Sequence, residues 1–170
     1  NNCIVTVKKD QKLKKGKIDK MGFGAFDIIE YKRSNKCSWQ LIIEIINFHT
    51  KQETTINDVV KTLVDRYVEL SKDNFDPMQM ITYSDVLNSM NIEGKKDQSN
   101  AIKRGVNIKE IITPANYYLT SMDFSIIAHK YKIPIIVVCR TGITYFRKTK
   151  PESISFINNE KPTSCYIILV

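Results

Sequence analysis

The hydrophobic positions of this chain follow a helical period over much of its length. Residues 38–49 are apolar on nearly every face, which predicts a central, buried helix. Residues 55–72 carry one apolar stripe at a spacing of three or four, which predicts an amphipathic helix. Thr82-Tyr83-Ser84-Asp85 has the form of a capping box, so a short helix is expected from there to Met90 and should stop near Gly94.

The last third of the chain mixes one helix with several strands. Ser121 is the expected N-cap of a helix over residues 122–132. The continuous apolar run at residues 133–138 predicts a central strand with both faces buried, while residues 95–100 are polar and predict a loop. Further strands are expected at residues 3–8, 143–147, 153–157 and 166–170.

This order of elements predicts the fold class and the number of domains. Most helices precede a closing cluster of strands, which is typical of an α+β fold in which a helical layer packs on a small, mainly antiparallel sheet. The length of 170 residues suits one domain, here residues 1–170. The chain begins with Asn1 instead of Met, so we expect it to be a piece of a longer protein.

The positive charge of the chain adds a basic segment to this picture. Net charge is +8, and the segment from Lys8 to Lys20 (residues 8–20) is rich in lysine and predicts a solvated basic loop. The enrichment in Ile, Lys and Asn is what an AT-rich genome encodes, so it explains much of the charge without a nucleic-acid partner. A nucleic-acid interface at this loop stays open as an alternative, although it lacks interleaved aromatic residues.

The cysteines argue for a reducing compartment inside a cell. The four of them are far apart in the sequence and form neither a CxxC pair nor a cluster with histidine, so neither a metal site nor a disulfide framework is expected. No apolar run approaches the roughly 18 residues that a membrane-spanning helix needs. We therefore expect an intracellular chain without a membrane partner, a metal or another cofactor.

One cysteine stands in a context that suggests chemistry. Cys37 immediately precedes the helix expected at residues 38–49, and Trp39 follows it closely. A thiol at a helix N-terminus faces the positive end of the helix dipole, which favours a reactive thiolate. The alternative is that Cys37 is a small apolar residue that helps to close the end of a core helix.

These residues resemble a known family. A cysteine at the head of a buried helix is the arrangement of the ovarian-tumour (OTU) type cysteine proteases, which have a papain-like fold and cleave ubiquitin linkages. The stretch Ile112-Thr113-Pro114-Ala115-Asn116-Tyr117-Tyr118-Leu119-Thr120-Ser121-Met122-Asp123, followed by a helix and by Ile133-Pro134-Ile135-Ile136-Val137-Val138, is similar to the OTU segment that leads into a core strand. It also looks like OTU-like segments of very large proteins of nucleocytoplasmic large DNA viruses, which implies host cytoplasm or the virion as the location.

The resemblance also shows where this chain departs from the family. OTU proteases usually carry an aspartate three residues before the nucleophile, where this chain has Ser34. Their catalytic histidine opens the last core strand in a His-Tyr or His-Phe pair, which reads Cys165-Tyr166 here. Since a cysteine cannot act as the general base that Cys37 would need, the chemistry is expected to be lost. His49 is expected to lie too far along its helix to replace that base, and His129 falls within the helix at residues 122–132, two elements before the final strand.

Three hypotheses follow from the sequence. The preferred one is a catalytically silent OTU-like module, a pseudoenzyme that binds a protein partner such as ubiquitin or another viral protein, or that has a structural role in a large viral protein. The second is an active deubiquitinase that uses Cys37 as its nucleophile. The third is a basic nucleic-acid-binding module built on the loop from Lys8 to Lys20.

Overall fold

The computed structural model describes residues 3–8, 26–31, 36–73, 75–76, 81–139, 142–145 and 166–169. This part of the chain is rich in helix. The helices are α2 (Cys37–Thr50), α3 (Ile56–Asp73), α4 (Tyr83–Ile92), α5 (Lys96–Lys103), α6 (Ile108–Ile111) and α7 (Ser121–Tyr131). The strands are β1 (Cys3–Lys8), β2 (Phe26–Tyr31), β3 (Phe75–Asp76), β4 (Ile81–Thr82), β5 (Ile135–Cys139), β6 (Gly142–Tyr145) and β7 (Tyr166–Leu169).

Five strands pair in the order β2-β1-β7-β5-β6, and β3 pairs separately with β4. The pairings β1–β2, β1–β7 and β5–β7 are parallel, and within this sheet only β5–β6 is antiparallel among the described strands. The expectation of a mainly antiparallel sheet is therefore wrong for these strands. Its physical cause is that β1 and β2, from the start of the chain, join the sheet beside the C-terminal β7, so the strands of this sheet do not pair as a series of hairpins.

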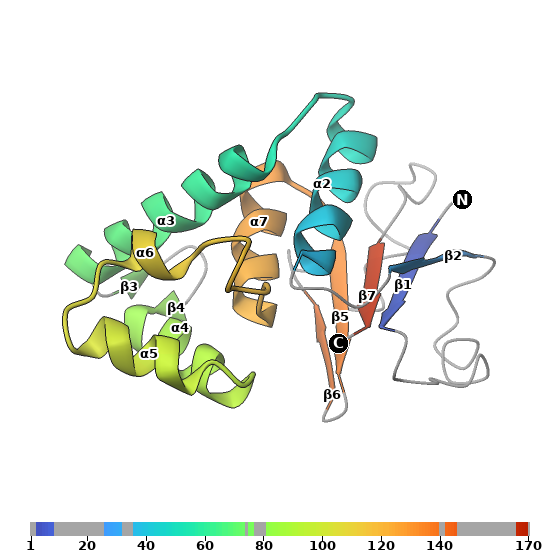
Figure 1. The fold of residues 1–170 in the computed structure, drawn as a ribbon. Coiled ribbons are helices and arrows are strands. Elements are labelled where there is room, and N and C mark those ends of the chain that lie inside the picture. The colour runs from blue at the N-terminus through green and yellow to red at the C-terminus, as the bar shows by residue number, and fades with distance from the viewer. Residues whose placement is uncertain are drawn as a thin grey trace.

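Helices α3 to α6 lie at one end of the molecule and the sheet at the other, with α2 and α7 between them (Figure 1). α7 contacts both α3 and β5, and it also contacts α2. Leu63 and Tyr67 of α3, Ile127 of α7 and Ile42 of α2 are fully buried in the hydrophobic core. The core therefore continues from the helical end of the chain to the helices nearest the sheet.

Several expected elements are confirmed. α2, α3, α4 and β5 lie where the apolar pattern placed them, within a few residues at each end. The side chain of Thr82 accepts the backbone N–H of Asp85, and the carboxylate of Asp85 accepts the backbone N–H of Thr82, so the capping box is present. β5 is hydrogen-bonded on both sides, by β6 and β7, as expected for a central strand.

Three expectations are wrong in detail. Residues 95–100 do not form a loop, because Ser99 and Ile102 give α5 a buried face that the polar composition hid. The N-cap of α7 is Thr120 and not Ser121, since the side chain of Thr120 accepts the N–H of Asp123. The strand β2 was not expected, whereas β1 lies at residues 3–8 as predicted. The strand expected at residues 153–157 lies outside the described residues.

Candidate functional site

Cys37 is the first residue of α2, as the sequence predicts, and its half-buried thiol is not part of a disulfide. The first turn closes through the backbone, where the N–H of Gln40 donates to the carbonyl of Lys36 at 3.0 Å. The side chain of Lys36 makes no capping hydrogen bond, and the first turn carries no acidic residue. Cys37 therefore stands at a helix end that its own side chains leave uncapped.

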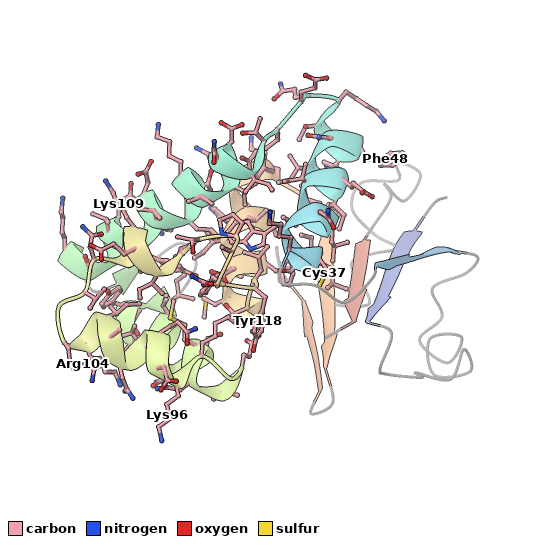
Figure 2. The ribbon with its side chains drawn as sticks, in the orientation of Figure 1. Cys37, Phe48, Lys96, Arg104, Lys109 and Tyr118 are labelled. Atoms are coloured by element: carbon pink, nitrogen blue, oxygen red, sulfur yellow. The ribbon has the colours of Figure 1, made fainter. Side chains whose placement is uncertain are left out.

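The start of α2 is fixed from the segment that leads into α7. The hydroxyl of Ser38 accepts a 3.0 Å hydrogen bond from the backbone N–H of Leu119. Trp39, whose side chain is fully buried, donates its indole N–H to the carbonyl of Tyr117 at 2.6 Å. Both neighbours of Tyr118 are thus bonded to the two residues that directly follow Cys37, so the backbone of Tyr118 passes the start of α2. Figure 2 labels Tyr118 and Cys37.

A buried carboxylate lies behind this contact. Asp123 is completely buried and accepts hydrogen bonds from the hydroxyls of Tyr67 and Tyr117, the latter at 2.7 Å. The backbone N–H and the hydroxyl of Thr120 donate to the same carboxylate at 2.6 and 3.0 Å. One aspartate therefore joins α3 and α7 to residues 117–120, the segment that bonds the start of α2. We call this segment the strap.

Burial controls the ionisation of this cluster. Loss of solvent raises the pKa of Asp123 above its ordinary value, and the hydrogen bonds from Thr120, Tyr67 and Tyr117 only partly oppose that shift. Burial, followed by the charge of Asp123, raises the pKa of Tyr67 and that of Tyr117 well above the ordinary tyrosine value. Both phenols therefore stay protonated near neutral pH and act as hydrogen-bond donors.

A second polar contact joins α4 to the start of α7. The carboxylate of Glu93 accepts the backbone N–H of Ser121 at 2.9 Å and its hydroxyl as well, and the hydroxyl of Ser89 donates to it at 3.0 Å. The hydroxyl of Tyr118 donates to the backbone carbonyl of Glu93 at 2.7 Å. Gly94 follows with a φ of +83°, a left-handed conformation that glycine adopts without strain.

Tyr118 is an exposed aromatic ring held in one position. The ammonium of the buried Lys95 lies 3.0 Å from the centroid of the Tyr118 ring and 5.2 Å from that of Tyr117. A further contact is the hydrogen bond to Glu93, yet 36% of Tyr118 remains exposed. Cation–π contact and hydrogen bond together leave little rotational freedom to a side chain that faces solvent.

Neither described histidine stands near Cys37. His49 lies in the last turn of the same helix, twelve residues on, which is roughly 18 Å at 1.5 Å per residue. His129 is exposed in the last turn of α7. It lies eight residues, or roughly 12 Å along the helix, beyond Ser121, which begins α7 directly after the segment that bonds the start of α2. A Cys–His dyad is therefore not formed by the described residues.

Of the remaining residues of the sequence hypothesis, only Trp39 lies in the described part of the chain with its side chain. Ser34 and Cys165 lie outside the described residues, as does the segment from Lys8 to Lys20 apart from Lys8 itself, which ends β1. Trp39 is placed as a core residue that supports α2, not as a reacting group. Among the described side chains, no group of three or more His, Cys, Asp or Glu residues could hold a metal ion. No described helix is long and apolar enough to cross a membrane.

The sequence interpretation missed the Asp123 cluster, although one signal for it was present. Thr120-Ser121-Met122-Asp123 has the spacing of a capping box, which would have identified Thr120 as the N-cap and Asp123 as its buried partner. The tyrosines could not be assigned to it, because Tyr67 is 56 residues away in the chain. Comparisons of the chain with protein-family models, with curated proteins and with solved structures found no significant match.

Proposed function

We propose that this chain is a catalytically silent OTU-like module that binds a protein partner through the surface beside Cys37. In this proposal the helices form a layer on the sheet in a papain-like arrangement, and α2 presents the former nucleophile. The observation that carries the proposal is the combination of a half-buried thiol at the head of a core helix with two described histidines that both lie far from it. A thiol in this position without an imidazole has no general base.

The surface itself supports binding instead of turnover. Tyr118 is partly exposed and is held by Lys95 and Glu93, so it can bury aromatic area against a partner with little loss of side-chain entropy. Tyrosine is among the residues that most often dominate binding energy in protein interfaces. Ubiquitin is the partner that the OTU resemblance implies, and another viral protein is the alternative partner.

The test for lost catalysis uses ubiquitin that carries a thiol-reactive group at its C-terminus. We expect no adduct on Cys37 beyond the background seen with Cys37→Ala, and we expect di-ubiquitin to persist during prolonged incubation. Substituting Cys165→His should not restore cleavage, since the aspartate usual before the nucleophile is replaced by Ser34. Cleavage that disappears in Cys37→Ala would instead establish an active cysteine protease.

The test for binding compares two exposed aromatic residues. Tyr118→Ala should weaken noncovalent binding of ubiquitin at least tenfold, which corresponds to roughly 1.4 kcal/mol. Phe48→Ala is the matched control, because Phe48 is also an exposed ring under a lysine, Lys51 at 4.3 Å, but lies near the far end of α2. Equal affinities of both variants for ubiquitin would exclude this surface as its binding site.

A further inference from the structure

The turn between α5 and α6 is a second surface that the proposed function does not use. Residues 103–107 are all exposed, and Lys109 just beyond them is exposed as well. We call the group of Lys103, Arg104, Gly105, Val106, Asn107 and Lys109 the α5–α6 turn. In Figure 2, Arg104 and Lys109 lie at the helical end of the molecule, on the side away from the sheet and from Cys37.

The backbone of this turn is fixed although its side chains face solvent. The N–H groups of Arg104, Gly105 and Val106 donate to carbonyls of the last turn of α5 at 2.9 to 3.1 Å. Gly105 has a φ of +94°, and the side chain of Asn107 caps α6 by accepting the N–H of Lys109 at 3.0 Å. A preformed turn loses little conformational entropy when it binds a ligand.

The cations of the turn are available to a ligand. Within the described part of the chain, none of Lys103, Arg104 and Lys109 forms an ion pair with a carboxylate. Glu110 beside Lys109 is the one acidic side chain in residues 103–110, so the segment has a net charge of +2. Binding an anion here therefore breaks no existing salt bridge.

We infer that the α5–α6 turn contacts the phosphate backbone of a nucleic acid. Arginine and lysine side chains bind phosphate oxygens without reading bases, and such contacts need charge and not an apolar surface. A protein partner would find little to bury, because Val106 is the only apolar residue of the turn and is 38% exposed. The net charge of +8 favours approach of a polyanion over longer distances.

The inference predicts weak binding that depends on salt and not on sequence. Three phosphate contacts give a slope of log affinity against log salt of about −2.7 for duplex DNA. These contacts would lose about 40-fold in affinity between about 50 and 200 mM salt. The contribution suits an auxiliary contact of a larger assembly better than a specific recognition site.

The experiment measures binding of fluorescently labelled duplex DNA by anisotropy over that salt range. The variant Lys103→Gln/Arg104→Gln/Lys109→Gln should bind roughly tenfold or more weakly at low salt, with a salt slope shallower by about 2.7. Its thermal unfolding should match that of the wild type, because exposed side chains away from packing contribute little to stability.

The matched control removes the same charge elsewhere. The variant Lys61→Gln/Lys72→Gln/Lys130→Gln alters exposed residues of α3 and α7 and should keep most of the affinity and slope. Equal losses in the two variants would show that bulk charge alone attracts DNA, and undetectable binding of the wild type at low salt would also overturn the inference. The inference would also fail if poly-glutamate displaced the labelled DNA as effectively as unlabelled DNA at equal charge concentration. The turn would then suit an acidic protein segment.

Discussion

The indole of Trp39 donates its N–H to the backbone carbonyl of Tyr117 at 2.6 Å, and the two rings lie 6.4 Å apart at an angle of 59°. Both side chains are fully buried. The phenol of Tyr117 then donates to Asp123, so one continuous series of contacts joins α2 to α7. The position of Cys37 therefore depends on residues that are about 80 positions away in the sequence.

Trp39→Phe should destabilise the fold by roughly 2–4 kcal/mol, because it leaves a cavity and a buried carbonyl without its donor. Urea unfolding followed by circular dichroism measures this, since the variant lacks the only tryptophan of the chain. Phe48→Leu on the exposed side of α2 is the control and should cost under about 1 kcal/mol. Similar losses in the two variants would contradict a special role for the contact between Trp39 and Tyr117.

Two glycines test how Tyr118 is held. Gly94 and Gly105 both have left-handed φ angles, of +83° and +94°, so alanine at either position adds a similar backbone strain of roughly 1 kcal/mol. A Cβ at Gly94 would lie 3.0 Å from the hydroxyl of Tyr118, whereas one at Gly105 would meet nothing within 4 Å.

Gly94→Ala should therefore cost more than Gly105→Ala by about 1 kcal/mol, the value of the hydrogen bond from Tyr118 to Glu93 that it disturbs. Thermal unfolding of both variants measures the difference. In the double variant Gly94→Ala/Tyr118→Phe the excess cost should disappear. If Gly94→Ala still destabilised the protein more than Gly105→Ala in the Tyr118→Phe background, the hydroxyl of Tyr118 would not be the cause of the difference.

The pH dependence of stability tests the buried carboxylate. Burial raises the pKa of Asp123, so between the unfolded value of about 3.9 and the folded value the folded state holds more protons than the unfolded state. The contribution of Asp123 is then fully present below about pH 3.9 and falls as the pH rises through the folded pKa. Asp123→Asn does not titrate, so the stability advantage of the wild type over it should shrink from acid to neutral pH.

Asp85 provides a control of opposite sign. Hydrogen bonds from the backbone and the side chain of Thr82 lower the pKa of Asp85, so its contribution is present above the unfolded pKa and is lost as the pH falls through the folded one. The advantage of the wild type over Asp85→Asn should therefore grow with pH. A growing advantage over Asp123→Asn as well would mean that the hydrogen bonds to Asp123 outweigh its burial.

Local signals predicted local structure well, and nonlocal contacts were beyond them. The apolar stripe of α3 and the capping box at Thr82 predict the helices because helix geometry depends on neighbours three or four residues away. The parallel pairing of β1 with β7 joins the two ends of the chain, and no periodicity in the sequence encodes it. α5 was missed because its buried face consists of only two side chains, Ser99 and Ile102.

In the candidate site, too, the sequence predicts the local feature but not the long-range contacts. The sequence predicts Cys37 at the head of α2, since a capping position is a local property. It does not predict that Ser38 and Trp39 bind the segment at Tyr117 to Leu119, because these contacts span about 80 residues. Sequence reasoning therefore found the thiol but not the strap beside it.

The reactivity of the thiol gives the most direct test of the proposed loss of catalysis. Without a base among the described histidines, Cys37 is assisted only by the dipole of α2, worth about 0.3–1 kcal/mol, or about two- to fivefold in rate. Its alkylation by iodoacetamide should therefore be at most about fivefold faster than that of an ordinary thiol. Mass spectrometry of the Cys37 peptide over a pH series measures this, with free glutathione as the reference. Reaction over tenfold faster, with a rate that stays flat between pH 5 and pH 8, would reveal a cationic partner of the thiolate and would end the pseudoenzyme proposal.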